Sequence, residues 1–116
     1  MGPAVRLADQ LLRPDESLHA PHLVDLEIMH VLRRYSFTGK LGSARALEIL
    51  ADLYALPIIR YPHEPFLRRI WELRLSVTAY DAAYVALAEV LDAPLVTCDR
   101  RLASTRGHRA AIEFIG

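Results

Sequence analysis

The sequence has few of the residues that would crosslink the chain or anchor it in a membrane. Its single cysteine, Cys98, excludes an internal disulfide and fits a reducing compartment. No apolar run approaches the roughly 20 residues of a membrane-spanning helix. Arg6 and Asp9 interrupt the apolar residues at the start of the chain, which is not typical of a secretory signal. We therefore expect a soluble, cytoplasmic protein.

The charge balance also excludes one class of protein. Fourteen basic residues match fourteen acidic ones, so the formal net charge is zero. A protein that coats nucleic acid through bulk positive charge is therefore excluded, whereas a local basic patch is not.

Several common functional motifs are absent. The sequence contains no G-x-x-x-x-G-K-[ST] and no G-x-G-x-x-G, so nucleotide binding by a phosphate loop is unsupported. A G-x-S-x-G elbow and paired zinc-binding cysteines are missing too. His19 and His22, with Asp25 nearby, are a weak metal candidate because Pro21 lies inside their strand-to-helix turn. Cys98 is more typical of a small buried apolar residue than of a nucleophile, since no histidine adjoins it.

The residues that are present favour a globular domain. The chain has 116 residues, and 53% of them are hydrophobic. A chain of this size can bury enough surface to fold without crosslinks. We therefore predict that residues 1–116 form a single domain.

Apolar periodicity predicts alternating helices and strands. Strands are expected at 17–20, 58–61, 95–97 and 112–115, and helices at 3–12, 22–35, 43–55, 65–74, 78–91 and 100–104. Ser43 is expected to cap the third helix. The alanines of 78–91 would let that helix pack closely on a sheet. This alternation predicts an α/β domain with a mostly parallel sheet covered on both faces, although the chain unusually opens on a helix.

Three carboxylates lie where apolar residues are expected. Glu27 flanks the apolar stripe of its helix, Asp81 lies on the stripe of the alanine-rich helix, and Asp99 directly follows the strand 95–97. The carboxyl ends of parallel strands are where α/β sheets bind ligands. Because buried carboxylates are costly unless paired or bound to metal, their convergence would suit Mg²⁺ or Mn²⁺.

Each of these acids also has a purely structural interpretation. Residues 78–81 match a capping box, so Asp81 could belong to the start of its own helix. Asp99 is a reasonable N-cap for the short helix after it. Glu27 could turn toward solvent or pair with Arg34 or another neighbouring basic side chain. Only the joint occurrence of the three acids favours a site.

Basic residues gather near the last of these acids. Arg100, Arg101, Arg106 and Arg109 follow Asp99 closely, and Arg33 and Arg34 follow Glu27 by about two turns. Arginine suits phosphate oxygens, so this pattern beside an acidic pocket would suit a nucleic-acid backbone. A solvated charged surface is the alternative for any one of them.

Three segments resemble the signature segments of PIN-domain proteins. They are residues 20–27 (APHLVDLE), 78–88 (TAYDAAYVALA) and 95–102 (LVTCDRRL), and the resemblance runs in order along the whole chain. It is strongest to the VapC-type toxins of bacterial toxin–antitoxin pairs.

The resemblance implies a PIN-like three-layer α/β/α domain that cleaves RNA with Mg²⁺ or Mn²⁺. Glu27, Asp81 and Asp99 fall on acidic positions of the family pattern and would be metal ligands and catalytic residues, while Thr97 falls on a small hydroxyl position near the last acid. Thr97, Arg100, Arg101 and Arg106 would contact RNA. A VapB-type antitoxin and a homodimer are also implied. A degenerate protein that binds an antitoxin without cleaving RNA is the alternative function, and an interaction domain whose acids are only caps and surface charges is a third.

The sequence departs from the family at its start. PIN-domain proteins open with a short apolar strand whose Asp is the first metal ligand, whereas here residues 1–3 align with the helix after it. Asp9 and Asp15 are not convincing substitutes. The family's first strand is central, between the strands predicted near Leu18 and Leu95, so its absence would leave two unpaired edges. Either the true chain starts upstream or this strand has been lost, and we favour the first explanation because the remaining pattern is intact.

Overall fold

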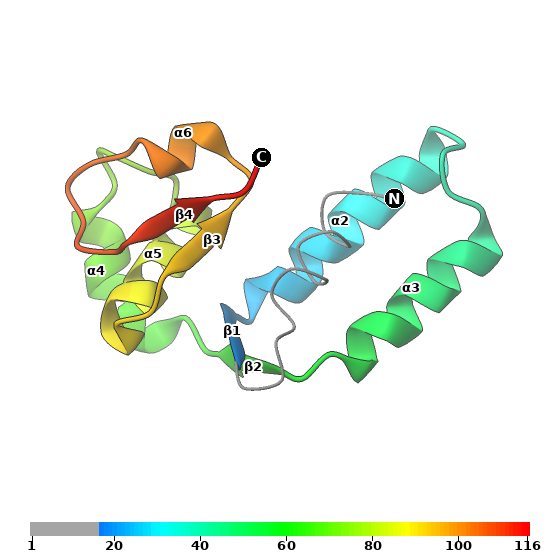
Figure 1. The fold of residues 1–116 in the computed structure, drawn as a ribbon, viewed down its shortest axis with the longest axis horizontal. Coiled ribbons are helices and arrows are strands. Elements are labelled where there is room, and N and C mark those ends of the chain that lie inside the picture. Colours follow the sequence, from blue (N-terminus) through cyan, green and yellow to red (C-terminus); the bar gives the residue numbers. More distant parts are fainter. Residues whose placement is uncertain (1–16) are drawn as a thin grey trace.

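The structure, a computed structural model, describes residues 17–116. Its strands are β1 (Leu18–Pro21), β2 (Ile58–Tyr61), β3 (Leu95–Thr97) and β4 (Ile112–Phe114). Its helices are α2 (Leu23–Phe37), α3 (Ser43–Ala55), the 3₁₀ turn η1 (Glu64–Phe66), α4 (Leu67–Glu72), α5 (Ala79–Leu91) and α6 (Arg100–Ala103). Strand β1 pairs with β2, and β3 with β4, both in parallel. The predicted α/β class with parallel strands is confirmed (Figure 1).

Most predicted elements are present, with corrections at their ends. Gly42, not Ser43, is the N-cap of α3, because Ser43 already begins the helix and no side chain caps it. The helix predicted at 65–74 instead starts as the 3₁₀ turn η1, with Pro65 in its first turn, and ends at Glu72. The predicted helix 3–12, with Asp9, and the turn residue Asp15 lie outside the described residues.

Within residues 17–116 the strands form two separate pairs rather than one continuous sheet. The ladders are β1–β2 and β3–β4, and no ladder hydrogen bonds join β1 to β3. Helix α5 nevertheless contacts both β1 and β3, and it lies beside β3 in Figure 1. The break falls between β1 and β3, where the family resemblance places its first strand, and the absence of that strand stays a prediction.

Helix α5 is the most buried element that the structure describes. Its Ala82, Val85 and Ala86 are fully inaccessible to solvent, so their small or compact side chains let the helix approach the strands closely, as predicted. Leu73 and Leu102 join Ala82 and Val85 in the main core cluster. Rigid burial of α5 fixes the direction in which its remaining side chains point.

Helices α2 and α3 form an antiparallel hairpin beside this core (Figure 1). Gly39, with a φ of +75°, supplies the left-handed backbone in the turn that follows α2. Helix α3 contributes no buried residue. No helix in the described part of the chain is long and apolar enough to cross a membrane.

Candidate active site

Glu27 meets a side chain that the sequence analysis missed. The Tyr84 hydroxyl of α5 donates a hydrogen bond to Oε1 of Glu27 in α2, across 57 positions of sequence. Glu27 therefore pairs with a phenol and not with Arg34. One signal was available in the sequence, since Tyr84 follows Asp81 by three residues and so lies on the same helix face.

The pKa of Tyr84 reflects its burial and the carboxylates near it. The pKa of its phenol is raised, first because the half-buried ring is desolvated, then because it donates to Glu27. The negative charges of Glu27, Asp81 and Asp25 raise it further. Of these three carboxylates, only Glu27 contacts the Tyr84 hydroxyl directly.

Asp25 forms an ion pair with Arg60. Its two oxygens accept from Nε and Nη2 of Arg60, at 2.7 and 2.8 Å, so the pair ties α2 to β2. The hydrogen bond to Asp25 raises the pKa of Arg60. His19, the other end of the weak metal candidate, instead bonds the Tyr61 hydroxyl through Nδ1 at 2.7 Å. These side chains hold strands and helices together.

Asp81 lies in the first turn of α5, directly after a cap. Thr78 is the N-cap residue, and its Oγ1 accepts from the backbone N–H of Asp81 at 3.2 Å. One hydrogen bond of the predicted capping box is thus confirmed, the one from the Asp81 backbone N–H to the Thr78 hydroxyl. Within residues 17–116 the Asp81 carboxylate forms no ion pair.

Asp99 stands at the carboxyl end of β3 as the N-cap of α6. Its Oδ1 accepts from the backbone N–H of Arg101 at 2.9 Å, so the structural interpretation of this residue is confirmed. The Thr97 hydroxyl accepts from the Asp99 backbone N–H at 3.0 Å and fixes the turn. The Asp99 side chain keeps 44% of its surface exposed.

The three acids are only partly brought together. Within residues 17–116 no group of three Asp, Glu, His or Cys side chains is close enough to hold a metal ion. Glu27 and Asp81 share the neighbourhood of Tyr84, whereas Asp99 is held at α6. Mg²⁺ commonly binds through one or two carboxylates and keeps several waters. The pair of carboxylates therefore fits such a cation in donor type and number.

The basic residues near Asp99 are exposed. Arg101 is almost fully exposed at 96%, and its Nε lies 4.0 Å from Asp99. The Arg100 guanidinium stacks over the Phe114 ring at 4.8 Å. Arg106 is exposed as well. Arg100 and Arg101 thus follow the end of β3, whereas Arg106 lies in the loop after α6, next to Gly107, whose carbonyl accepts from Arg69.

Cys98 lies between Thr97 and Asp99 and is exposed. The prediction that it is a small buried residue is wrong, because β3 ends at Thr97 and the chain turns outward into α6.

The opposite end of α5 carries a different acid. Glu89 accepts from Nε and Nη2 of Arg69, at 2.7 and 2.8 Å, and from the backbone N–H of Arg109 at 2.7 Å. These hydrogen bonds, those of Arg69 first, lower the pKa of Glu89 to about 2, although burial acts in the opposite direction. This pair was not predicted from the sequence.

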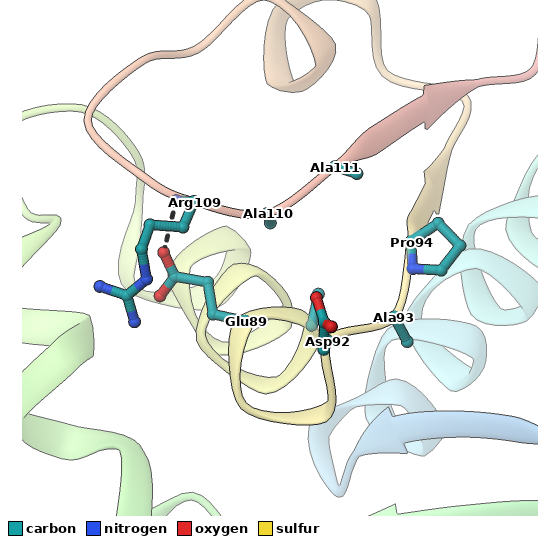
Figure 2. A pocket seen from close by; sticks show the side chains of 8 residues that line it. Glu89, Asp92, Ala93, Pro94, Arg109, Ala110 and Ala111 are labelled. Atoms are coloured by element: carbon teal, nitrogen blue, oxygen red, sulfur yellow. Dashed lines mark hydrogen bonds between the residues drawn. The ribbon is translucent and has the colours of Figure 1, made fainter.

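Beside Glu89 lies a cavity of about 300 Å³, which Asp92 and Arg109 also line (Figure 2). Asp92 is about 16 Å from Asp81 along the helix axis. This cavity is therefore separate from the part of the molecule that carries Glu27, Asp81 and Asp99, which we call the acidic edge.

Comparison with known proteins identifies the family of this chain. The family model of the PIN domain matches residues 3–107. The chain is 40% identical over 100 residues to Ribonuclease VapC12 of Mycobacterium tuberculosis, covering 86% of this chain and 78% of that protein. It is 49% identical over 90 residues to Ribonuclease VapC9 of the same organism, covering 78% of this chain and 71% of that one.

A third relative has a similar span. Ribonuclease VapC1 of Mycobacterium tuberculosis is 44% identical over 98 residues, which cover 84% of this chain and 74% of that protein. The family match and these relatives both extend over most of the chain. The chain therefore belongs to the PIN-domain family, among relatives that are VapC ribonucleases.

Proposed function

We propose that this chain is a metal-dependent endoribonuclease, the toxin of a type II toxin–antitoxin pair, which cleaves RNA phosphodiester bonds. The observation that carries the proposal is the hydrogen bond from Tyr84 to Glu27, which brings this carboxylate to the face of α5 that also carries Asp81. No lysine or arginine of residues 17–116 forms an ion pair with either of them. Uncompensated carboxylates at one edge attract a divalent cation.

Mg²⁺ or Mn²⁺ is the proposed ion, with Glu27, Asp81 and Asp99 as its ligands. When bound, such an ion lowers the pKa of a coordinated water and offsets negative charge on the attacked phosphate. Asp99 uses Oδ1 as a helix cap, and its second oxygen has no hydrogen-bond partner within residues 17–116. That oxygen is the one we assign to the ion.

Three arginines and one threonine have further roles in the proposal. Arg100, Arg101 and Arg106 contact RNA phosphates, since exposed guanidinium groups donate paired hydrogen bonds to phosphate oxygens. Thr97 was predicted to touch RNA. Its hydroxyl already accepts from the Asp99 backbone, so we assign it first to the orientation of Asp99.

A catalytically weak protein that binds an antitoxin is the second candidate. The observation that favours it is the separation of Asp99 from the other two acids, together with its cap contact. A site with two converging carboxylates binds a cation less tightly than one with three. This candidate predicts antitoxin binding with little or no metal-dependent cleavage.

Cleavage of total bacterial RNA tests the proposal. The purified chain is incubated with Mn²⁺ or Mg²⁺ and, in parallel, with EDTA. We expect cleavage only with metal, and a loss of about 100-fold in Asp81→Asn, because the ion's stabilisation of the transition state amounts to several kcal/mol. Asp92→Asn is the matched control, since it removes a carboxylate from the far end of the same helix.

Two outcomes contradict the proposal. One is the absence of metal-dependent cleavage, and the other is equal cleavage by the parent and by Asp81→Asn. If the chain cleaves nothing but binds a VapB-type antitoxin in a pull-down, the second candidate stands.

We further propose a VapB-type antitoxin as partner, a homodimer and a cytoplasmic location. An RNA substrate and an exposed free thiol at Cys98 both fit a reducing interior. Light scattering coupled to gel filtration, with and without the antitoxin, measures both assemblies. A monomer at all concentrations would contradict the dimer.

A further inference from the structure

The contact between Tyr84 and Glu27 suggests a role for a residue that is not itself a ligand. Glu27 is an exposed side chain on α2 with several rotatable bonds. Tyr84 comes from α5, whose flanking residues Ala83 and Val85 are buried and hold the helix in place. The phenol is thus the better-anchored partner, and its hydroxyl fixes one oxygen of Glu27.

The chemistry of the donor matters as much as its position. A guanidinium group neutralises the carboxylate it binds, as Arg60 does for Asp25 and Arg69 does for Glu89. A phenol is neutral, so it orients Glu27 and leaves its negative charge intact. It also occupies Oε1 alone, which leaves Oε2 for another partner.

The placement of Tyr84 on its helix adds a second constraint. Tyr84 lies three residues after Asp81 and shares its face of α5. By holding Glu27, it brings the carboxylate of α2 to the end of the helix that carries Asp81. Groups that orient a ligand in this way commonly change metal affinity by 10- to 100-fold when they are removed.

We propose that Tyr84 is a positioning residue that holds Glu27 next to Asp81 for a divalent cation. This inference rests on the proposed function, in which Glu27 and Asp81 are metal ligands. Tyr84 touches neither the ion nor RNA and acts through Glu27 alone.

Calorimetric titration with Mn²⁺ tests this role without any measurement of cleavage. We expect the dissociation constant of the purified chain to rise about tenfold in Tyr84→Phe, which removes only the hydroxyl. Tyr80→Phe is the matched control, since Tyr80 is on the same helix and 68% exposed, and it should leave the affinity unchanged. Equal affinities of Tyr84→Phe and the parent would overturn the inference.

A double-mutant cycle separates positioning from a general loss of structure. If Tyr84 acts through Glu27, Tyr84→Phe should have no further effect on Mn²⁺ affinity once Glu27→Gln is present. Independent, additive effects of the two substitutions would overturn the inference. Urea unfolding in the titration buffer, before Mn²⁺ is added, shows whether each variant is folded.

A second variant covers the case in which Tyr84→Phe does not fold. Glu27→Asp keeps the charge but draws it back from the phenol, so it should also weaken Mn²⁺ binding about tenfold, and an unchanged affinity would count against the inference. If the parent chain binds no Mn²⁺, the proposed function fails and the inference fails with it. If the parent binds and Tyr84→Phe binds equally, the inference alone fails.

Discussion

The two ends of α5 handle a carboxylate in opposite ways. At the C-terminal end, the side chain of Glu89 is 1% exposed, pairs with the guanidinium of Arg69 and accepts from the backbone N–H of Arg109. At the N-terminal end, Glu27 accepts from the neutral phenol of Tyr84, Asp81 lies on the same helix face, and no ion pair within residues 17–116 compensates either carboxylate.

This difference assigns the carboxylate at one end of α5 to stability and the carboxylates at the other end to ligand binding. A buried carboxylate with all its acceptors used joins α4, α5 and the loop before β4, and it cannot take a ligand. Carboxylates that are exposed or half-buried and keep a free oxygen add little to stability and retain the capacity to bind a cation. Carboxylates on one helix can thus serve different purposes, and their partners decide which.

The largest expected effect is at the C-terminal end of α5, where Arg69 pairs with Glu89. Arg69→Met leaves Glu89 buried without its cation, and breaking a pair of this kind costs about 3 kcal/mol. Urea unfolding followed by circular dichroism measures this cost. Arg68→Met is the control, because Arg68 is exposed beside it. Equal unfolding midpoints for both variants would remove the distinction between the two ends of the helix.

Acid should weaken the same ion pair between Arg69 and Glu89. The pKa of Glu89 is lowered from 4.5 to about 2 in the folded chain. A lowered pKa stabilises the fold above the unfolded value, so this contribution is complete above pH 4.5 and is lost as the pH falls toward 2. We expect the unfolding free energy to drop across this window in the parent and to drop less in Glu89→Gln. Parallel pH profiles for the two proteins would contradict this assignment.

At the acidic edge, Asp99→Asn distinguishes a ligand from a cap. Asparagine caps helices as well as aspartate does, so the unfolding midpoint should not change. Loss of the negative charge should reduce metal-dependent RNA cleavage by about 100-fold, or about 2.7 kcal/mol. Cleavage by Asp99→Asn at the parent rate would show that Asp99 only caps α6.

The smallest effect is expected at the ion pair between α2 and β2. Asp25 and Arg60 are both partly exposed, so Asp25→Asn should cost about 1 kcal/mol or less in unfolding free energy. Mn²⁺ affinity should stay close to the parent value because Asp25 is already paired. A tenfold loss of affinity in this variant would mean that Asp25, and not only Glu27 and Asp81, serves the cation.

Local sequence chemistry determined much of this structure. Apolar periodicity and the Thr78 cap predicted α5, and the β-branched runs predicted β2 and β3 at the bounds that the structure shows. These elements depend on neighbouring residues, which the sequence displays directly. The cap role of Asp99 followed from the same local rules.

Pairing across the chain was beyond the reach of these rules. The phenol that holds Glu27 lies 57 positions away, and Arg69 lies 20 positions from Glu89. A periodic pattern shows that a side chain faces inward or outward, but not which side chain it meets. The division into two strand pairs also depends on contacts between distant segments.

The sequence by itself determined the family, the α/β class and the residue types of the acidic edge, because motif segments and helical or strand periodicity are local properties. Only the tertiary structure decided that Glu27 bonds the phenol of Tyr84 and that Glu89 pairs with Arg69. The physical reason is that charge compensation depends on distance in space, and folding alone sets that distance.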